Sequence, residues 1–104
     1  MDENFQEAVL NLVKQIPKGK VTTYGEIARE ITGSVRAARA VGQVVAKNPY
    51  PVVIPCHRVV RSNGDIGGYS LGVDKKIKLL CEEGIKIKGR KVLNLDKALF
   101  YFKF

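Results

Sequence analysis

The chain has few of the residues that build metal sites and covalent cross-links. Its 104 residues include one histidine, His57, and two cysteines, Cys56 and Cys81. One histidine without a Cys-x-x-Cys pair supplies too few ligands for a zinc site, so we expect no metal. Two cysteines in a chain without secretory features do not predict a structural disulfide.

Acidic residues and long apolar runs are also scarce. Ten Asp and Glu oppose eighteen Lys and Arg, so the net charge is +8. This excess predicts an anionic partner, with nucleic acid as the first candidate; the alternative is charge that only keeps the chain soluble. No apolar run approaches the ~20 residues that span a bilayer, and Met1-Asp2-Glu3 begins no secretory signal. We therefore expect no membrane partner and a location inside the cell.

The composition that remains is that of one soluble domain. Apolar residues make up 45% of the chain and charged residues 27%, which is typical of a globular protein and not of a disordered tail. The length allows a single modest core. Residues 1–104 are therefore predicted to form one domain.

Helical periodicity dominates the first half of the chain. Apolar residues at helical spacing predict a first helix over residues 5–16, with Asn4 and Glu7 as its capping pair and Pro17 as its stop. After a short extended stretch, the capping box Thr23-x-x-Glu26 opens a second helix that runs to Ile31.

A third helix follows after a turn of three residues. Ser34 is placed to cap this helix, which runs to about Lys47. Two helices joined by a short turn that contains glycine are typical of a helix-turn-helix. One face of the third helix carries polar and basic residues: Arg36, Arg39, Gln43 and Lys47. Its small residues permit two interpretations, close helix packing or insertion into a nucleic-acid groove; they are Ala37, Ala38, Ala40 and Gly42.

The second half of the chain is more varied. Residues 52–54 are predicted to be a short strand or an extended approach to Cys56, and residues 62–65 a turn. A glycine-rich loop at 67–72 precedes a helix over 74–83, whose buried face is expected to include Ile77, Leu80 and Cys81. The alternation after Ile85 indicates a small hairpin, and the aromatic segment 96–104 a short helix or a strand. The fold class predicted is mainly α with a small β element.

Pro55-Cys56-His57-Arg58-Val59 is the run with the clearest chemical meaning. A cysteine attacks as its thiolate, and neighbouring cations favour that form. The alternative is a small buried apolar residue at the end of a strand. His57 is the only histidine, and prolines 49, 51 and 55 fix the backbone, which together favour a nucleophile. Adjacent side chains on an extended backbone point apart, so a water between Cys56 and His57, with a carboxylate behind the imidazole, would solve the geometry.

The stretch from Asn48 to Val60, with Gly67-Gly68-Tyr69-Ser70 after it, resembles the O6-alkylguanine-DNA alkyltransferases, also called methylated-DNA–protein-cysteine methyltransferases. The resemblance covers about Phe5 to Ile87. It implies a winged-helix-like, three-helix DNA-binding domain that repairs DNA by direct reversal. A single-turnover transfer would move the alkyl group of O6-alkylguanine to Cys56, with O4-alkylthymine as a second candidate substrate. It also implies a monomer that needs no cofactor, binds double-stranded DNA and is cytoplasmic, in the nucleoid or nucleus.

Roles for particular residues follow from the same resemblance. The relay runs from Cys56 through a water to His57 and Glu83, and Asn48 braces the Pro-x-Pro turn. The residues expected at the extruded base are Tyr24, which meets the base and its phosphate, Arg39, which fills the vacated stack, and Tyr69 and Ser70, which lie near O6. Further DNA contacts are expected from Ser34, Arg36, Ala37, Ala38, Gly42, Gln43, Lys47 and Ser62.

Two departures and three alternatives accompany the resemblance. The family's N-terminal companion domain is expected to be absent, and Leu71 stands where the family usually has glycine, which bears on loop stiffness and on the alkyl groups accepted.

One alternative is a lesion sensor that binds alkylguanine without transfer; such proteins replace the cysteine, often with tryptophan, whereas this chain has Cys56 and no tryptophan. The others are a helix-turn-helix transcription regulator, which leaves the Cys-His-Arg run unexplained, and a cysteine hydrolase, for which no oxyanion hole is identified.

Overall fold

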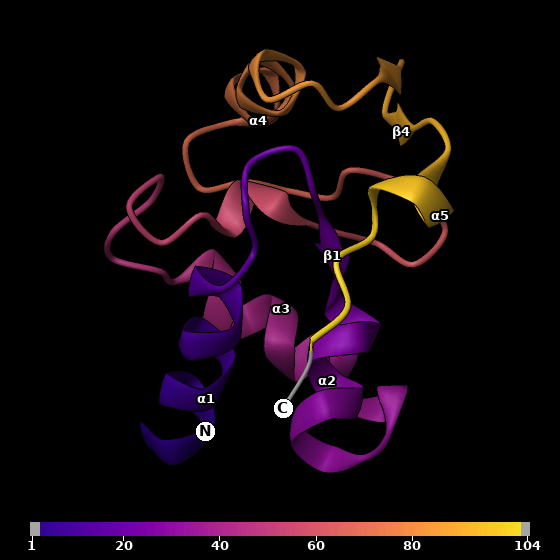
Figure 1. Cartoon of the computed structure of the whole chain (residues 1–104). Coiled ribbons are helices and arrows are strands. Elements are labelled where there is room, and N and C mark those ends of the chain that lie inside the picture. The colour runs from indigo at the N-terminus through magenta and orange to yellow at the C-terminus, as the bar shows by residue number, and fades with distance from the viewer. Residues whose placement is uncertain (1–2, 103–104) are drawn as a thin grey trace.

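The computed structural model describes residues 3–102, and these form a mainly helical molecule with two small sheets (Figure 1). This agrees with the fold class predicted from the sequence. The helices are α1 (Glu3–Lys14), α2 (Tyr24–Thr32), α3 (Ala38–Ala46), α4 (Val73–Glu82) and α5 (Leu95–Ala98), with 3₁₀ turns η1 (Val35–Ala37) and η2 (Cys56–Arg58). The strands are β1 (Thr22–Thr23), β2 (Val59–Val60), β3 (Ile87–Lys88) and β4 (Lys91–Val92).

Helix α1 forms because its apolar residues fall on one face. Val9, Leu12 and Val13 are buried on that face, as the periodicity predicts. The start of the helix differs from the prediction: Glu3 and Asn4 are already helical, so Asn4 is not the N-cap.

The helix-turn-helix is built by local capping. The hydroxyl of Thr23 accepts a hydrogen bond from the backbone N–H of Glu26 at 3.0 Å, as the capping box predicts. Gly33 ends α2 with φ of 78°, a conformation that favours glycine. Ser34 caps the 3₁₀ turn η1 through the N–H of Arg36 at 3.1 Å, so the predicted third helix is divided and α3 begins only at Ala38.

Two short pairings tie distant segments together. Strand β1 pairs in parallel with β2, Thr22 opposite Val59, and so brings the segment after Cys56 to the start of α2. The predicted hairpin is confirmed as the antiparallel pair β3–β4. The short strand or extended approach expected at 52–54 is not formed; the chain turns at 52–53 instead, and Val52 has φ of 75°.

The core consists of two clusters. One lies among α1, α2 and α3 and includes the buried Cys56. The other lies beneath α4 and the hairpin.

Cys81 was expected on the buried face of its helix but is exposed, and Lys76 is buried there beside Leu80. The reason is helical phase, because Lys76 and Leu80 are four positions apart and share the inner face of α4.

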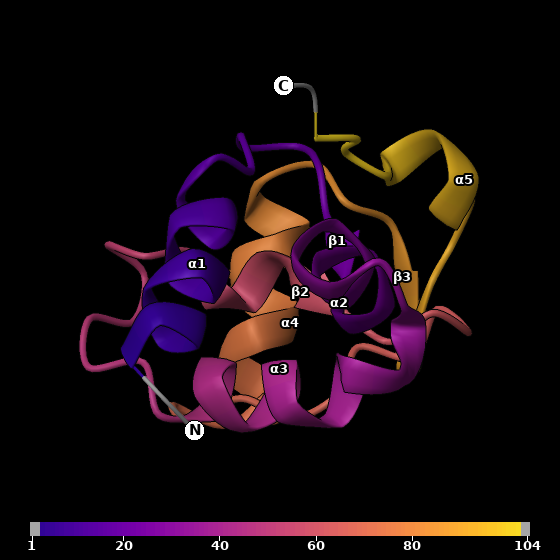
Figure 2. The same cartoon turned by 90° about the horizontal axis from the view of Figure 1, so that it is seen from below.

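The two clusters correspond to two halves of the molecule. In Figure 1, α1, α2 and α3 occupy the lower half and α4 with the hairpin the upper half. Seen from below in Figure 2, α3 runs along the lower edge of the picture. No helix within residues 3–102 is long and apolar enough to cross a membrane.

The C-terminal aromatic segment begins with the short helix α5 and packs onto the body of the molecule. Its backbone pairs with Val21, whose N–H donates to Ala98 and whose carbonyl accepts from Phe100. The rings of Phe100 and Phe102 meet edge to face and pack against the first core cluster. Phe104, the last residue of the segment 96–104, lies outside the described residues.

Candidate functional site

Cys56 opens the 3₁₀ turn η2 directly after Pro55. Its side chain is buried, but the residue lines a groove of about 1140 Å³. The lining comes from the start of α2, from α3 and from the segments 61–63 and 68–70. A buried thiol at the edge of a large cavity is placed to react with a group that enters the cavity and is otherwise shielded from solvent.

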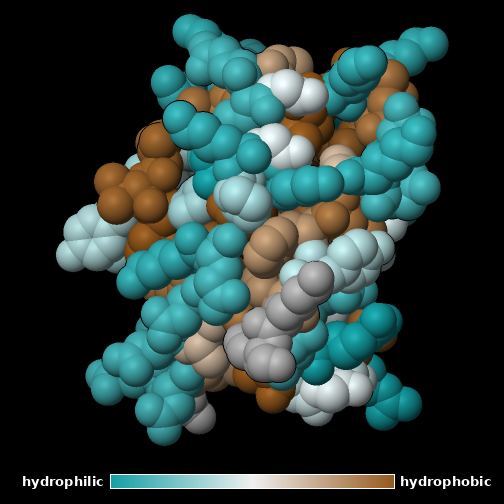
Figure 3. Space-filling model, viewed as in Figure 1, coloured by the Kyte–Doolittle hydropathy of each residue, from teal (hydrophilic) through white to brown (hydrophobic). Residues whose placement is uncertain are grey.

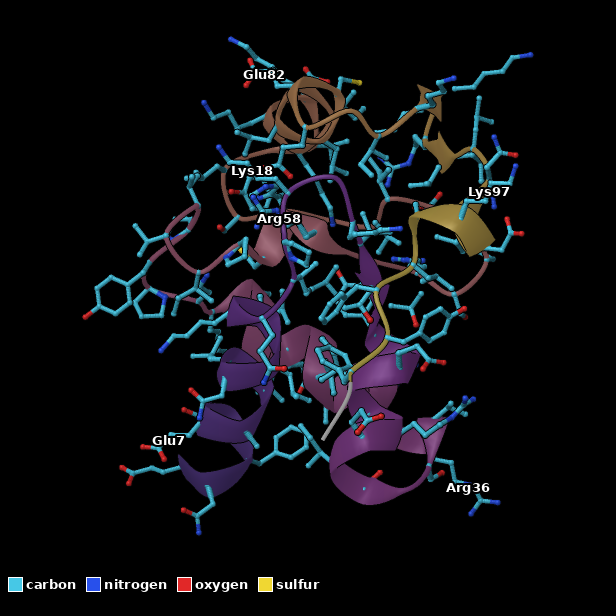
Figure 4. The ribbon with its side chains drawn as sticks, in the orientation of Figure 1. Glu7, Lys18, Arg36, Arg58, Glu82 and Lys97 are labelled. Atoms are coloured by element: carbon cyan, nitrogen blue, oxygen red, sulfur yellow. The ribbon has the colours of Figure 1, made fainter. Side chains whose placement is uncertain are left out.

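The groove brings together most of the residues that the sequence singled out. Those that line it are Tyr24, Ala38, Arg39, Gly42, Gln43, Cys56, Ser62, Tyr69 and Ser70. Ser34, Arg36 and Ala37 lie in or next to η1 and do not line it; the side chain of Arg36 points into solvent (Figure 4). Lys47 lies beyond the end of α3 and lines a separate small cavity with Gln6 and Leu10, so the predicted stripe is divided between two places.

Behind the thiol, His57 is buried and paired with Glu83. Its Nε2 lies 3.0 Å from Oε2 of Glu83, which is 26 positions along the chain. Its Nδ1 is buried and has no hydrogen-bond partner among residues 3–102. His57 and Glu83 are therefore brought together as the resemblance implies, and the second ring nitrogen is left without a protein partner.

The electrostatics of this pair decide which nitrogen carries the proton. Burial lowers the pKa of His57 below its usual value, and the Glu83 hydrogen bond and charge only partly oppose this. For Glu83, burial acts to raise the pKa, but hydrogen bonds from Arg58 and His57 outweigh it and the pKa is lowered. At neutral pH the pair is a neutral imidazole and a carboxylate. The proton lies on Nε2, which donates to Glu83, and Nδ1 is the acceptor.

Arg58 has a different position from the one its sequence neighbours suggested. We interpreted it as a cation beside the thiol that favours the thiolate. Instead, its Nε and Nη2 donate to the two oxygens of Glu83 at 2.8 and 2.7 Å, and its Nη1 donates to the carbonyl of Ile16 at 2.7 Å. Figure 4 shows Arg58 inside the molecule. Arg58 therefore fixes Glu83 and anchors both to the segment after α1.

Asn48 holds the turn that precedes the thiol. Its Nδ2 donates to the carbonyl of Ile54 and its Oδ1 accepts from the N–H of Tyr50, both at 3.0 Å. The loop between them projects Tyr50 and Val53 into solvent. Figure 3 shows hydrophobic atoms gathered at the left of the molecule, where this loop lies in Figure 1. Two hydrogen bonds from one buried amide thus fix the approach to Cys56.

Two tyrosines present hydroxyls near the thiol. Burial raises the pKa of both Tyr24 and Tyr69, so each hydroxyl keeps its proton at neutral pH and can donate. The hydroxyl of Tyr69 is buried and has no partner among the described residues, and its ring meets His57 edge-on at a centroid distance of 6.3 Å. A polar ligand in the groove would supply the missing acceptor.

Sequence reasoning missed Lys76. Its Nζ donates to the carbonyls of Val59 at 2.8 Å and Gly68 at 3.1 Å, so it ties the glycine-rich loop to the strand after Cys56. Burial lowers its pKa to about 8. The one signal in the sequence was helical phase, because Lys76 shares the inner face of α4 with Leu80.

The described residues contain no cluster of three His, Cys, Asp or Glu side chains placed to hold a metal ion. The groove presents the thiol, the two phenols and the arginines, and the imidazole–carboxylate pair lies behind the thiol.

Comparisons with known proteins place this arrangement in a family. Residues 4–85 match the family described as "6-O-methylguanine DNA methyltransferase, DNA binding domain". The methylated-DNA–protein-cysteine methyltransferase of Methanothermobacter thermautotrophicus is 45% identical over 83% of this chain and 47% of its own length. The corresponding protein of Methanosarcina acetivorans is 49% identical over 77% of this chain and 51% of its own length. The chain spans about half the length of these curated relatives.

Two solved structures resemble the whole arrangement. The DNA complex of Mycobacterium tuberculosis OGT matches with a TM-score of 0.75 and 40% identity over 81% of this chain and 51% of that one. S. pombe Atl1, in complex with damaged DNA containing O6-carboxymethylguanine, matches with a TM-score of 0.81 and 36% identity over 96% of this chain and 97% of that one. The chain therefore belongs to the 6-O-methylguanine DNA methyltransferase family, through that family's DNA-binding domain.

Proposed function

We propose that this protein repairs DNA by moving an alkyl group from O6 of guanine to the sulfur of Cys56. The observation that carries the proposal is the position of Cys56. The thiol lies at a groove lined by the recognition helix α3, with the His57–Glu83 pair behind it. The DNA-bound relatives of the same fold support a DNA substrate.

The chemistry follows from the protonation states. Nδ1 of neutral His57 accepts the proton of Cys56 through a bridging water, and Glu83, fixed by Arg58, stabilises the imidazolium that forms. The thiolate then forms a bond to the alkyl carbon as the bond from that carbon to O6 breaks. The proton returns to the guanine that leaves, and Tyr69 donates to the developing negative charge. The thioether on Cys56 is stable, so each chain acts once.

The guanine must leave the duplex to reach this thiol, because an alkyl group on a base edge is inaccessible inside a stack. Arg39 and Gln43 line the groove from α3, and we assign to Arg39 the space that the base vacates. Ser34, Arg36, Ala37 and Lys47 contact the flanking backbone. We further propose that the protein acts as a monomer, in whatever compartment holds the DNA.

The decisive experiment is intact-mass measurement after incubation with a duplex that contains O6-methylguanine. We expect one added methyl group per chain, mapped to Cys56, and no second turnover. Cys81 is a built-in control because it is the more exposed thiol; methyl on Cys81 would indicate non-specific alkylation. Cys56→Ser should bind the duplex and gain no mass, since a hydroxyl is a far weaker nucleophile.

A second candidate function is lesion binding without transfer, which the match to S. pombe Atl1 along nearly its whole length favours. The same experiment separates the two. Tight binding to the lesion duplex with no added mass on the wild-type protein would favour the sensor, whereas a preference for one unmodified DNA sequence would favour a transcription regulator.

A further inference from the structure

Arg61 is a groove residue to which no role has yet been assigned. It follows β2 and begins a tight turn that two backbone hydrogen bonds close, from its own N–H to the carbonyl of Asp65 at 2.8 Å and from the N–H of Gly64 to its carbonyl at 2.9 Å. The carboxamide of Asn63 accepts from the N–H of Asp65 within the same turn. Arg61 therefore projects from a rigid element, together with the groove residues Ser62 and Asn63.

Among residues 3–102, the guanidinium of Arg61 has no hydrogen bond or ion pair to the protein. Two nearby arginines are paired, Arg29 with Glu26 at 3.2 Å and Arg90 with Asp65 at 3.4 Å. Arg39, which lines the groove from α3, has no ion pair among the described residues either. Arg61 is exposed and lines the groove without such a partner. An unpaired cation on a fixed turn is available to an anion that enters the groove.

The charge of Arg61 acts on the hydroxyl of Tyr24 and on the carboxylate of Asp65. Both side chains pack over Gly67: a Cβ there would lie 3.3 Å from the Tyr24 hydroxyl and 3.7 Å from Cγ of Arg61. Burial raises the pKa of Tyr24, and the positive charge of Arg61 opposes that rise. The phenol therefore stays protonated as a donor beside a guanidinium that has only donors.

Two neighbouring donors are well matched by one acceptor that has several oxygens. A phosphate supplies them, and a planar guanidinium can bind it through two parallel hydrogen bonds. We propose that Arg61 and the Tyr24 hydroxyl together bind one backbone phosphate next to the extruded nucleotide, so that the lesion is held in the groove by its own strand. This inference rests on the proposed function in taking DNA as the ligand; the resemblance pointed to Tyr24 but not to Arg61.

The test maps the phosphate. A set of duplexes carries O6-methylguanine and one neutral methylphosphonate at successive positions around the lesion, and binding is measured in a Cys56→Ser background so that no transfer occurs. We expect Arg61→Ala to weaken binding to the unmodified backbone about tenfold, the size of one charged hydrogen bond. The slope of log affinity against log salt should fall by about one.

At one phosphate position, the neutral methylphosphonate should lower the DNA affinity of the Cys56→Ser protein about tenfold. It should lower the affinity of the protein that also carries Arg61→Ala less than twofold. Arg61→Lys should lie between the two because it keeps the charge and loses the planar fork. The matched control is Lys78→Ala, which removes one positive charge from the exposed face of α4 outside the groove and should change affinity less than twofold.

Equal losses for both proteins at every phosphate would overturn the inference, since Arg61 would then contribute only general attraction. Failure of the proposed function is a separate result. If wild-type protein bound the lesion duplex and gained no mass, alkyl transfer would be disproved, and the methylphosphonate series would still show whether Arg61 binds a phosphate. Failure of the Cys56→Ser protein to bind any duplex would overturn both.

Discussion

Glu82 and Glu83 are adjacent and chemically identical, but their surroundings differ. Glu83 accepts two hydrogen bonds from Arg58 and one from His57, and the Arg58 and Glu83 side chains are only 11% and 10% exposed. Glu82 is exposed and points away from the body in Figure 4. Removing one partner of a buried ion pair leaves the other charge uncompensated, which costs far more than losing an exposed charge.

We therefore expect Glu83→Gln to lower the free energy of unfolding by about 3 kcal/mol and to slow transfer strongly. The lowered pKa of Glu83 contributes stability that is present above its unfolded pKa of about 4.3 and is lost as pH falls through the lower folded value. The variant should consequently lose less stability than wild type as pH falls below about 4.3. Denaturant unfolding at several pH values measures both effects, with Glu82→Gln as the control, expected within about 0.5 kcal/mol of wild type. A Glu82→Gln loss as large as that of Glu83→Gln would contradict this account.

At the scale of the element, the slim third helix serves the groove. Gly42 and Ala38 line it, and Gly42 faces the ring of Tyr24. A Cβ on Gly42 would lie 3.8 Å from that ring, an ordinary contact, and the residue is inside α3. Gly33 has open space around it but has φ of 78°.

These surroundings predict that replacing glycine with alanine raises stability at position 42 and lowers it at position 33. Gly42→Ala should stabilise the protein by about 0.5–1 kcal/mol because alanine loses less backbone entropy in a helix. Gly33→Ala should destabilise it by about 1 kcal/mol because an L side chain is strained in that conformation. Thermal unfolding of both variants provides the measurement, and a stabilising Gly33→Ala would show that local space, and not φ, governs the turn.

At the scale of the whole molecule, the C-terminal segment joins the two halves. Its backbone pairs with Val21 between the clusters, Leu95 and Ala98 pack against the second, and Phe100 and Phe102 against the first.

Truncation after Leu95 should lower Tm by roughly 10 °C or more, since it removes apolar burial from both clusters. Tyr101→Ala is the control within the same segment because that side chain is 57% exposed. A truncated chain with the melting curve of wild type would show that the segment only covers the surface.

The sequence by itself determined what depends on neighbours within a few positions. Helical periodicity located α1 and α4, the capping box of Thr23 and Glu26 located α2, and alternation located the hairpin. The Pro-Cys-His-Arg run identified the thiol, because the residues that suit a nucleophile are adjacent in the chain. These features are local, and local spacing fixes them.

Only the tertiary structure decided the contacts that join distant segments. Arg58 bonds Glu83 across 25 positions and Ile16 across 42, so the cation assigned to the thiol serves the carboxylate instead. The burial of Lys76 and the exposure of Cys81 depend on which face of α4 meets the core. The unpaired Arg61 emerges only when the turn after β2 is placed in the groove. Partners of this kind are set by the path of the chain in space, and no local pattern encodes that path.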